Sequence, residues 1–145
     1  MQNFSKDNLT FYTLIIIFLI GSYFVINIFS YFDITNFCYI STERDIVRGN
    51  EKTIKQALKY LKKNKKDDYK MVCKYVETIS EKYCIVADWH LGESLLREGC
   101  KLPGCYIKGS KTIYLKPSEE TGENIIKKRA GDIIKYSNFS KEFWN

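Results

Sequence analysis

The sequence predicts an α+β protein in which one apolar N-terminal helix precedes a small folded domain. Three observations predict this class: an uncharged apolar run near the N-terminus, two stretches with helical periodicity after it, and a β-rich stretch followed by a third helix. With 145 residues there is room for one domain, and 45% hydrophobic with 28% charged residues exclude a disordered chain. We expect a tail over 1–8, an anchor over 9–32, a stalk over 33–50 and an α+β domain over 51–145.

The apolar run from Leu9 to Phe32 is 24 residues long and contains no charged residue. As a helix it would measure about 36 Å, against about 30 Å for the hydrocarbon core of a bilayer. A cleavable signal peptide is disfavoured because the run is too long and lacks a small-residue cleavage site. The sequence therefore predicts a retained transmembrane helix, a single-pass signal-anchor, with the lipid bilayer as a partner.

Two signals bear on the orientation of the domain, and they disagree. Positive charges are more numerous after the apolar run than before it, which favours a cytoplasmic domain by the positive-inside rule. Long domains, however, translocate largely regardless of charge, and the cysteine content favours an oxidising compartment. We expect a membrane localisation with the C-terminal domain outside the cytoplasm.

The domain is expected to begin with a helix pair. Ile54, Ala57, Leu58 and Leu61 follow the i, i+3, i+4, i+7 spacing of one helix face. A second apolar face recurs over 67–83. The short, lysine-rich segment between the two stretches predicts an antiparallel pair.

A short antiparallel β-hairpin and a C-terminal helix complete the expected fold. The stretch over 105–116 contains two β-branched and aromatic runs separated by Gly109-Ser110, which suits a two-residue hairpin turn. The stretch over 121–137 carries isoleucines at helical spacing.

Five cysteines are present, and four of them are candidates for two disulfides in the domain: Cys73, Cys84, Cys100 and Cys105. The sequence does not fix their connectivity, although Cys100 and Cys105 suit a small closed loop. Cys73 also lies on an apolar helix face, where a buried core thiol is the simpler interpretation. Cys38 is left as an odd thiol, an inter-chain bridge or, facing the cytoplasm, a lipidation site.

The same region allows a structural zinc site as an alternative. Cys84, His90, Cys100 and Cys105 supply three thiolates and one imidazole within 22 positions, a ligand set that zinc accepts. His90 is the only histidine, so a Cys–His pair is the only imidazole chemistry available. Because nothing in the spacing supports such a pair, we predict no catalytic residue and no cofactor.

A basic stretch is the clearest candidate for binding. Between Lys52 and Lys74 there are nine lysines and two acids. Five of the lysines recur at helical spacing opposite the apolar stripe: Lys52, Lys55, Lys59, Lys62 and Lys66. A solvated polar face is the simplest interpretation, and attraction to a polyanion is the functional one. The expected partners are anionic headgroups, cell-wall polymers or another membrane or envelope protein, whereas the lack of a recognition motif disfavours nucleic acid.

One stretch resembles a known family. Ile113-Tyr-Leu115, a short connection and an isoleucine-rich helix are similar to the edge strand and active-site helix of zincin metallopeptidases, over residues 105–137. Where that family has HExxH, this sequence has Gly131-Asp-Ile-Ile-Lys135, so both zinc histidines are absent and Asp132 replaces the glutamate. The resemblance implies a degenerate, inactive relative.

These observations predict a membrane-anchored protein whose disulfide-stabilised, basic domain acts in binding or as a structural, accessory component of the envelope. Two alternatives stay open: an inactive peptidase-like module or Cys/His enzyme, and a zinc-stabilised module facing the cytoplasm. An enzyme is disfavoured because the sequence contains no catalytic constellation.

Overall fold

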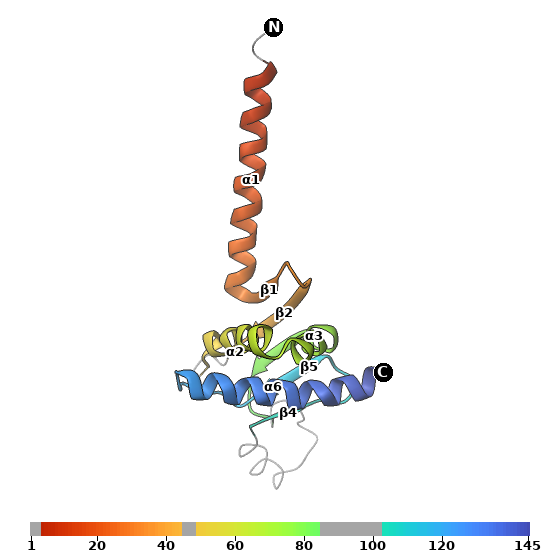
Figure 1. The fold of residues 1–145 in the computed structure, drawn as a ribbon. Helices are drawn as coiled ribbons and strands as arrows, with labels where there is room; N and C mark the ends of the chain where they lie inside the picture. Colours follow the sequence, from red (N-terminus) through yellow and green to blue (C-terminus); the bar gives the residue numbers. More distant parts are fainter. Residues whose placement is uncertain (1–3, 45–48, 85–102) are drawn as a thin grey trace.

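The computed structural model describes residues 4–44, 49–84 and 103–145. Helix α1 (Phe4–Phe29) projects away from an α+β domain that contains the rest of the described chain (Figure 1). In this domain α2 (Glu51–Asn64), α3 (Lys66–Tyr75) and α6 (Glu123–Trp144) pack against one another over a five-stranded sheet. The fold is therefore α+β, with four helices and one mixed sheet among the described residues.

The apolar N-terminal run does not form one continuous helix. Helix α1 ends at Phe29, and the chain continues directly into strand β1 (Ser30–Asp33), where Ser30, Tyr31 and Asp33 are buried in the domain. Threonine, tyrosine, serine and asparagine residues also interrupt the apolar run. Within the described ranges, no helix is both long enough and apolar enough to cross a membrane. The prediction of a transmembrane anchor over 9–32, and with it the single-pass membrane localisation, is therefore wrong.

The sheet has the strand order β1-β2-β3-β5-β4. Its remaining strands are β2 (Cys38–Glu43), β3 (Thr78–Glu81), β4 (Gly104–Tyr106) and β5 (Thr112–Leu115). The three central strands β2, β3 and β5 run parallel, and each edge strand is antiparallel to its neighbour. Helices α2 and α3 connect β2 to β3, because parallel neighbours need a long crossover.

Two strands lie in stretches where the sequence predicts a stalk or a helix. Strand β2 lies inside the expected stalk over 33–50, and β3 lies inside the expected second helix over 67–83. Helix α3 already ends at Tyr75, and β3 pairs with parallel neighbours on both sides. A short apolar run fits a helix or a buried strand equally well, so tertiary pairing decides between them.

The hairpin of β4 and β5 forms as the sequence predicts, with Tyr106 opposite Ile113. Its loop spans 107–111 rather than two residues, and Gly109 supplies the positive φ of 84° that the turn requires. Gly104 is required for packing, because a Cβ there would collide with the Tyr114 carbonyl oxygen and the Tyr136 ring.

The core lies between the sheet and the three helices. In β2 the burial alternates, so that Cys38, Ile40 and Thr42 face the helices while Tyr39 and Glu43 are exposed. The largest fully buried aliphatic residues come from both layers: Ile40, Ile79, Ile113 and Leu115 from the sheet, and Ile54, Leu58, Leu61 and Ile133 from the helices. This packing fixes α2 and α3 on the sheet and leaves their outer faces to solvent.

Candidate functional site

The outer face of α2 carries a row of lysines. Ile54, Leu58 and Leu61 are buried on one side of this helix, while Lys52 and Lys59 are exposed on the other. At 100° per residue Lys52, Lys59 and Lys63 share one face, directly opposite the buried stripe. At a rise of about 1.5 Å per residue this row is about 16 Å long.

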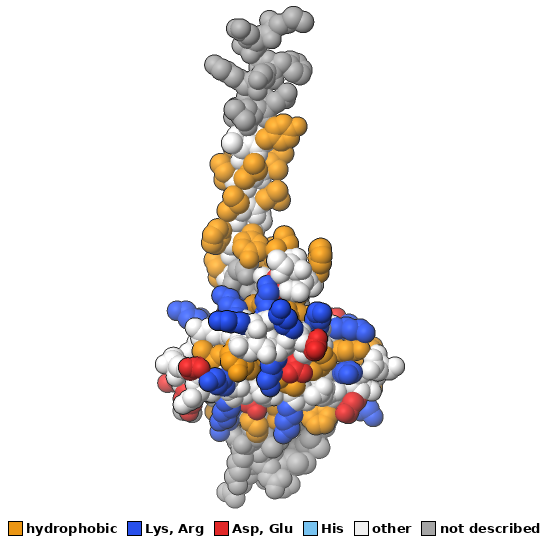
Figure 2. Space-filling view, viewed as in Figure 1, with side chains coloured by type: hydrophobic (Ala, Val, Ile, Leu, Met, Phe, Trp, Pro, Cys, Tyr) orange, Lys and Arg blue, Asp and Glu red, His pale blue; other side chains and the backbone are white. Residues whose placement is uncertain are grey.

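Helix α3 continues the positive charge. Six exposed lysines of α2, of the first half of α3 and of the residue between them form what we call the basic surface: Lys52, Lys59, Lys63, Lys65, Lys66 and Lys70. Lys74, in the last turn of α3, is also exposed, and its ammonium group lies 4.9 Å from the centroid of the Tyr75 ring. None of the six has a carboxylate within ion-pair distance in the part of the chain that the structure describes. Figure 2 shows Lys and Arg side chains gathered over the α2–α3 layer, near the point where α1 leaves the domain.

Two acids lie close to this surface. Asp67 and Asp68 occupy the first turn of α3, where a negative charge is favourable to the helix dipole. They offset part of the positive charge, but six lysines against two carboxylates leave the surface strongly basic.

Two of the lysines that the sequence placed on this face have other roles. Lys55 forms an i,i+4 ion pair with Glu51 and donates a hydrogen bond of 2.9 Å to the carbonyl oxygen of Ile28. Lys62 pairs with Asp33 at 2.9 Å. The contact with Ile28 joins α2 to the last turn of α1, and the contact with Asp33 joins α2 to the end of β1. Ile28 and Asp33 are too distant in the sequence for periodicity to reveal these contacts.

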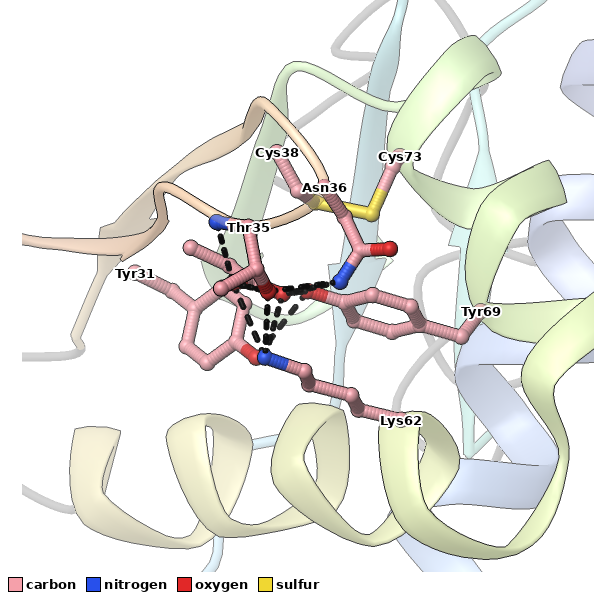
Figure 3. Close-up of a disulfide and its surroundings, with 8 residues drawn as sticks. Tyr31, Thr35, Asn36, Cys38, Lys62, Tyr69 and Cys73 are labelled. Atoms are coloured by element: carbon pink, nitrogen blue, oxygen red, sulfur yellow. Dashed lines mark hydrogen bonds and ion pairs between the residues drawn. A yellow bond between two sulfur atoms is a disulfide. The ribbon is translucent and has the colours of Figure 1, made fainter.

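Asp33 is the buried centre of a polar cluster whose other members include the exposed Thr35 and Asn36 (Figure 3). Its carboxylate accepts hydrogen bonds from the Tyr69 hydroxyl at 2.7 Å, the Thr35 hydroxyl at 2.7 Å, the Asn36 amide at 2.8 Å and the Lys62 ammonium at 2.9 Å. The Tyr31 hydroxyl lies 3.1 Å from the Tyr69 hydroxyl. We call these six residues the Asp33 cluster; they tie β1 and the following turn to α2 and α3.

The pKa shifts in this cluster follow from burial and hydrogen bonding. Burial alone would raise the pKa of the Asp33 carboxyl, but the hydrogen bonds from Thr35, Lys62, Tyr69 and Asn36 hold this pKa far below its ordinary value. Burial raises the pKa of Tyr69, and its hydrogen bonds to Tyr31 and Asp33 raise it further. At neutral pH the cluster therefore contains a charged carboxylate beside two neutral phenols.

A disulfide lies beside the Asp33 cluster (Figure 3). It joins Cys38 in β2 to Cys73 in α3, with a Cα–Cα distance of 5.2 Å. Cys38 is therefore not the odd thiol that the sequence suggested. The bond fixes α3 to the sheet next to the cluster, so two independent devices hold the helices that carry the basic surface.

A second disulfide joins Cys84 to Cys105, with a Cα–Cα distance of 5.8 Å. This pairing rules out the loop between Cys100 and Cys105 that the spacing suggested. It also removes two thiolates from the alternative zinc set, because a disulfide sulfur is not a thiolate ligand. His90 and Cys100, the other two members of that set, lie outside the described residues.

The stretch that resembles a zincin has a strand followed by a helix. Strand β5 lies between β3 and β4 and is not at the edge of the sheet, and Asp132 is half-buried on α6. This position differs from the edge strand that the resemblance implies. The resemblance itself stays a prediction.

Comparisons with known proteins give no relative: no family model, no curated protein and no solved structure matches this chain.

Proposed function

We propose that the protein binds an anionic polymer through the basic surface on α2 and α3. The observation that carries this proposal is the group of six exposed lysines that have no carboxylate partner in the described part of the chain. Three other lysines on the same helices have contacts within the chain: Lys55 and Lys62 pair with carboxylates, and Lys74 lies over the Tyr75 ring. The six are therefore the ones left for a partner.

The chemistry of lysine defines the class of partner. An ammonium group is a compact, strongly hydrated point charge that does not demand the planar geometry an arginine does. A row of such charges attracts closely spaced anions without reading their arrangement in detail. Phosphate-bearing polymers supply such anions, and their binding releases counterions and weakens with salt.

The scaffold favours this role because the lysines stand on rigid elements. The core packing, the Cys38–Cys73 disulfide and the Asp33 cluster fix α2 and α3 on the sheet. Only the lysine side chains then have to be ordered on binding, which limits the entropic cost of association.

The test uses long-chain polyphosphate and the full chain. The triple variant Lys52→Gln, Lys59→Gln, Lys63→Gln removes the outermost row of α2. We expect about a tenfold weaker Kd, and a salt dependence of log Kd that is shallower by about two, because each lost contact releases less than one counterion. The matched control removes three exposed lysines elsewhere, Lys108, Lys128 and Lys141.

The control separates a defined surface from overall charge. If both triple variants lose affinity equally, binding follows the net charge of +6 and the proposal fails. Single-stranded DNA of matched charge is the second arm. Tighter binding of the DNA that also depends on its base sequence would make nucleic acid the partner, in place of a polymer that is recognised by its charge alone.

A further inference from the structure

A cavity of about 170 Å³ lies where the chain passes from β5 into α6, and its lining shares no residue with the basic surface. Leu115, the last residue of β5, and Ile125, in the first turns of α6, form apolar parts of its wall. The cavity is at the carboxyl ends of the parallel strands, where open sheets with parallel strands commonly bind ligands.

One wall of the cavity is formed by Arg129, which is only 3% exposed. Its Nη2 group donates to a carboxylate oxygen of Glu81, which is fully buried at the end of β3. The Nε and Nη1 groups of Arg129 have no acceptor in the described part of the chain. Buried donors without an acceptor are rare in folded proteins, because each loses its water without replacement.

The other charged residues around the cavity are of both signs. Lys116 and Lys128 line it together with Arg129, and so do Glu120 and Asp132. A dianion such as phosphate would meet two carboxylates here, and an apolar ligand would leave the Nε and Nη1 groups of Arg129 without an acceptor. A ligand with one carboxylate and one hydrogen-bond donor can pair with the cationic and the anionic residues of the cavity at the same time.

The ionisation behaviour of Asp132 favours a ligand that donates a hydrogen bond to its carboxyl group. Burial raises the pKa of its carboxyl group, and the positive charges of Lys128, Lys135 and Arg129 lower it only in part. A donor from a ligand would stabilise the charged carboxylate, as the donors around Asp33 do within the protein.

The volume limits the size of the ligand. A cavity of about 150 Å³ holds benzene, which has six non-hydrogen atoms. The cavity of about 170 Å³ therefore suits a molecule the size of alanine or lactate.

We infer that this cavity binds a small amino acid or hydroxy acid, whose carboxylate accepts hydrogen bonds from Arg129 and whose amino or hydroxyl group donates to Asp132. Alanine and lactate distinguish the two kinds of donor. Propionate has the carboxylate without the donor, and phosphate is a dianion of similar size.

The first experiment is calorimetric titration of the full chain with these four compounds. We expect one-to-one binding of alanine or lactate, about tenfold weaker binding of propionate, and weaker binding still of phosphate, because unpaired polar groups in a site are penalised. Equal binding of all four, or binding of none, would overturn the assignment.

Two conservative variants test the residues. Arg129→Lys keeps a cation for Glu81 but loses the planar set of donors, so alanine or lactate should bind about tenfold more weakly. Asp132→Asn removes the charged acceptor, so the preference for alanine or lactate over propionate should fall below about threefold. Arg44→Lys and Asp67→Asn make the same changes at exposed positions and should leave binding unchanged.

Circular dichroism of each variant precedes the titrations. If Arg129→Lys does not fold, Asp132→Asn decides the matter, because Asp132 has no buried ion-pair partner in the described chain. An unchanged preference over propionate in Asp132→Asn would overturn the inference.

Discussion

Asp33 and Arg129 are both buried charged residues, but they differ in how many of their hydrogen-bonding groups have a partner among the described residues. Asp33 accepts five hydrogen bonds, from the backbone and hydroxyl of Thr35, from Asn36, from Lys62 and from Tyr69. Arg129 donates to Glu81 alone among the described residues, and two of its three nitrogens have no acceptor. A charge whose partners all come from the chain is a structural element, whereas a charge with donors left over can still bind an acceptor from outside.

The surroundings of the two groups agree with this difference. The Asp33 cluster lies beside a disulfide, between β1 and the helices that carry the basic surface. Arg129 instead lines a cavity between β5 and α6. The first region fixes elements in place, and the second leaves room for a small molecule.

The largest effect should come from removing the disulfide beside the Asp33 cluster. Cys38 and Cys73 are 35 residues apart, so the variant Cys38→Ala, Cys73→Ala should lose about 4 kcal/mol of unfolding free energy. Urea unfolding measures the loss. The control is Cys84→Ala, Cys105→Ala, whose separation of 21 residues gives about 3 kcal/mol. A clearly larger loss in the control would mean that the bond beside the cluster does not have the role given to it here.

The same substitution at two aspartates sharpens the comparison. Asp33→Asn should cost about 2–3 kcal/mol, because several hydrogen bonds to a buried carboxylate are weakened together. Asp132→Asn should change stability by less than about 0.5 kcal/mol or stabilise the protein, because burial already disfavours its charged form. Denaturant titrations of both variants at neutral pH give the two values. Equal losses would remove the distinction between a satisfied and an unsatisfied site.

The smallest effect is in the pH dependence, where the two aspartates should act with opposite signs. The folded-state pKa of Asp33 is lowered, so its contribution is present above the unfolded pKa of about 4 and is lost as the pH falls below it. The folded-state pKa of Asp132 is raised, so its charged form costs stability increasingly as the pH rises above about 4. In urea unfolding between pH 3 and pH 7, the gap between the unmodified protein and Asp33→Asn should therefore narrow towards acid. The advantage of Asp132→Asn should grow towards neutral pH, and the opposite trends would refute the assigned shifts.

Local patterns in the sequence were enough to predict α2 and the first part of α3, but not the end of α3 or the pairing of the cysteines. The spacing of Ile54, Leu58 and Leu61 predicts α2, because this helix has one buried stripe and one solvated face. Strand β3 could not be predicted in the same way, because its two parallel neighbours come from segments far away in the chain. The apolar N-terminal run was interpreted by composition alone, which does not reveal that its last residues pair with β2.

The two charged sites differ in how visible they are in the sequence. The partners of Asp33 on the helices lie 29 and 36 residues away, and Asp33 itself only marks the end of an apolar run. Arg129 leaves a signal, because it follows Ile125 by four residues and precedes Ile133 by four, within the buried stripe of α6. A cation on an apolar stripe predicts a buried charge, but its partner Glu81 and the cavity need the folded chain.

The most direct test follows the side-chain signals of both sites by NMR during one titration with alanine or lactate. The Nε–H signal of Arg129, assigned by its loss in Arg129→Lys, reports on the cavity. The side-chain amide signals of Asn36 report on the Asp33 cluster. We expect the Arg129 signal to shift and saturate with the heat of binding while the Asn36 signals stay in place. An Arg129 signal that does not move at saturating ligand would contradict the central claim that its leftover donors mark a binding site.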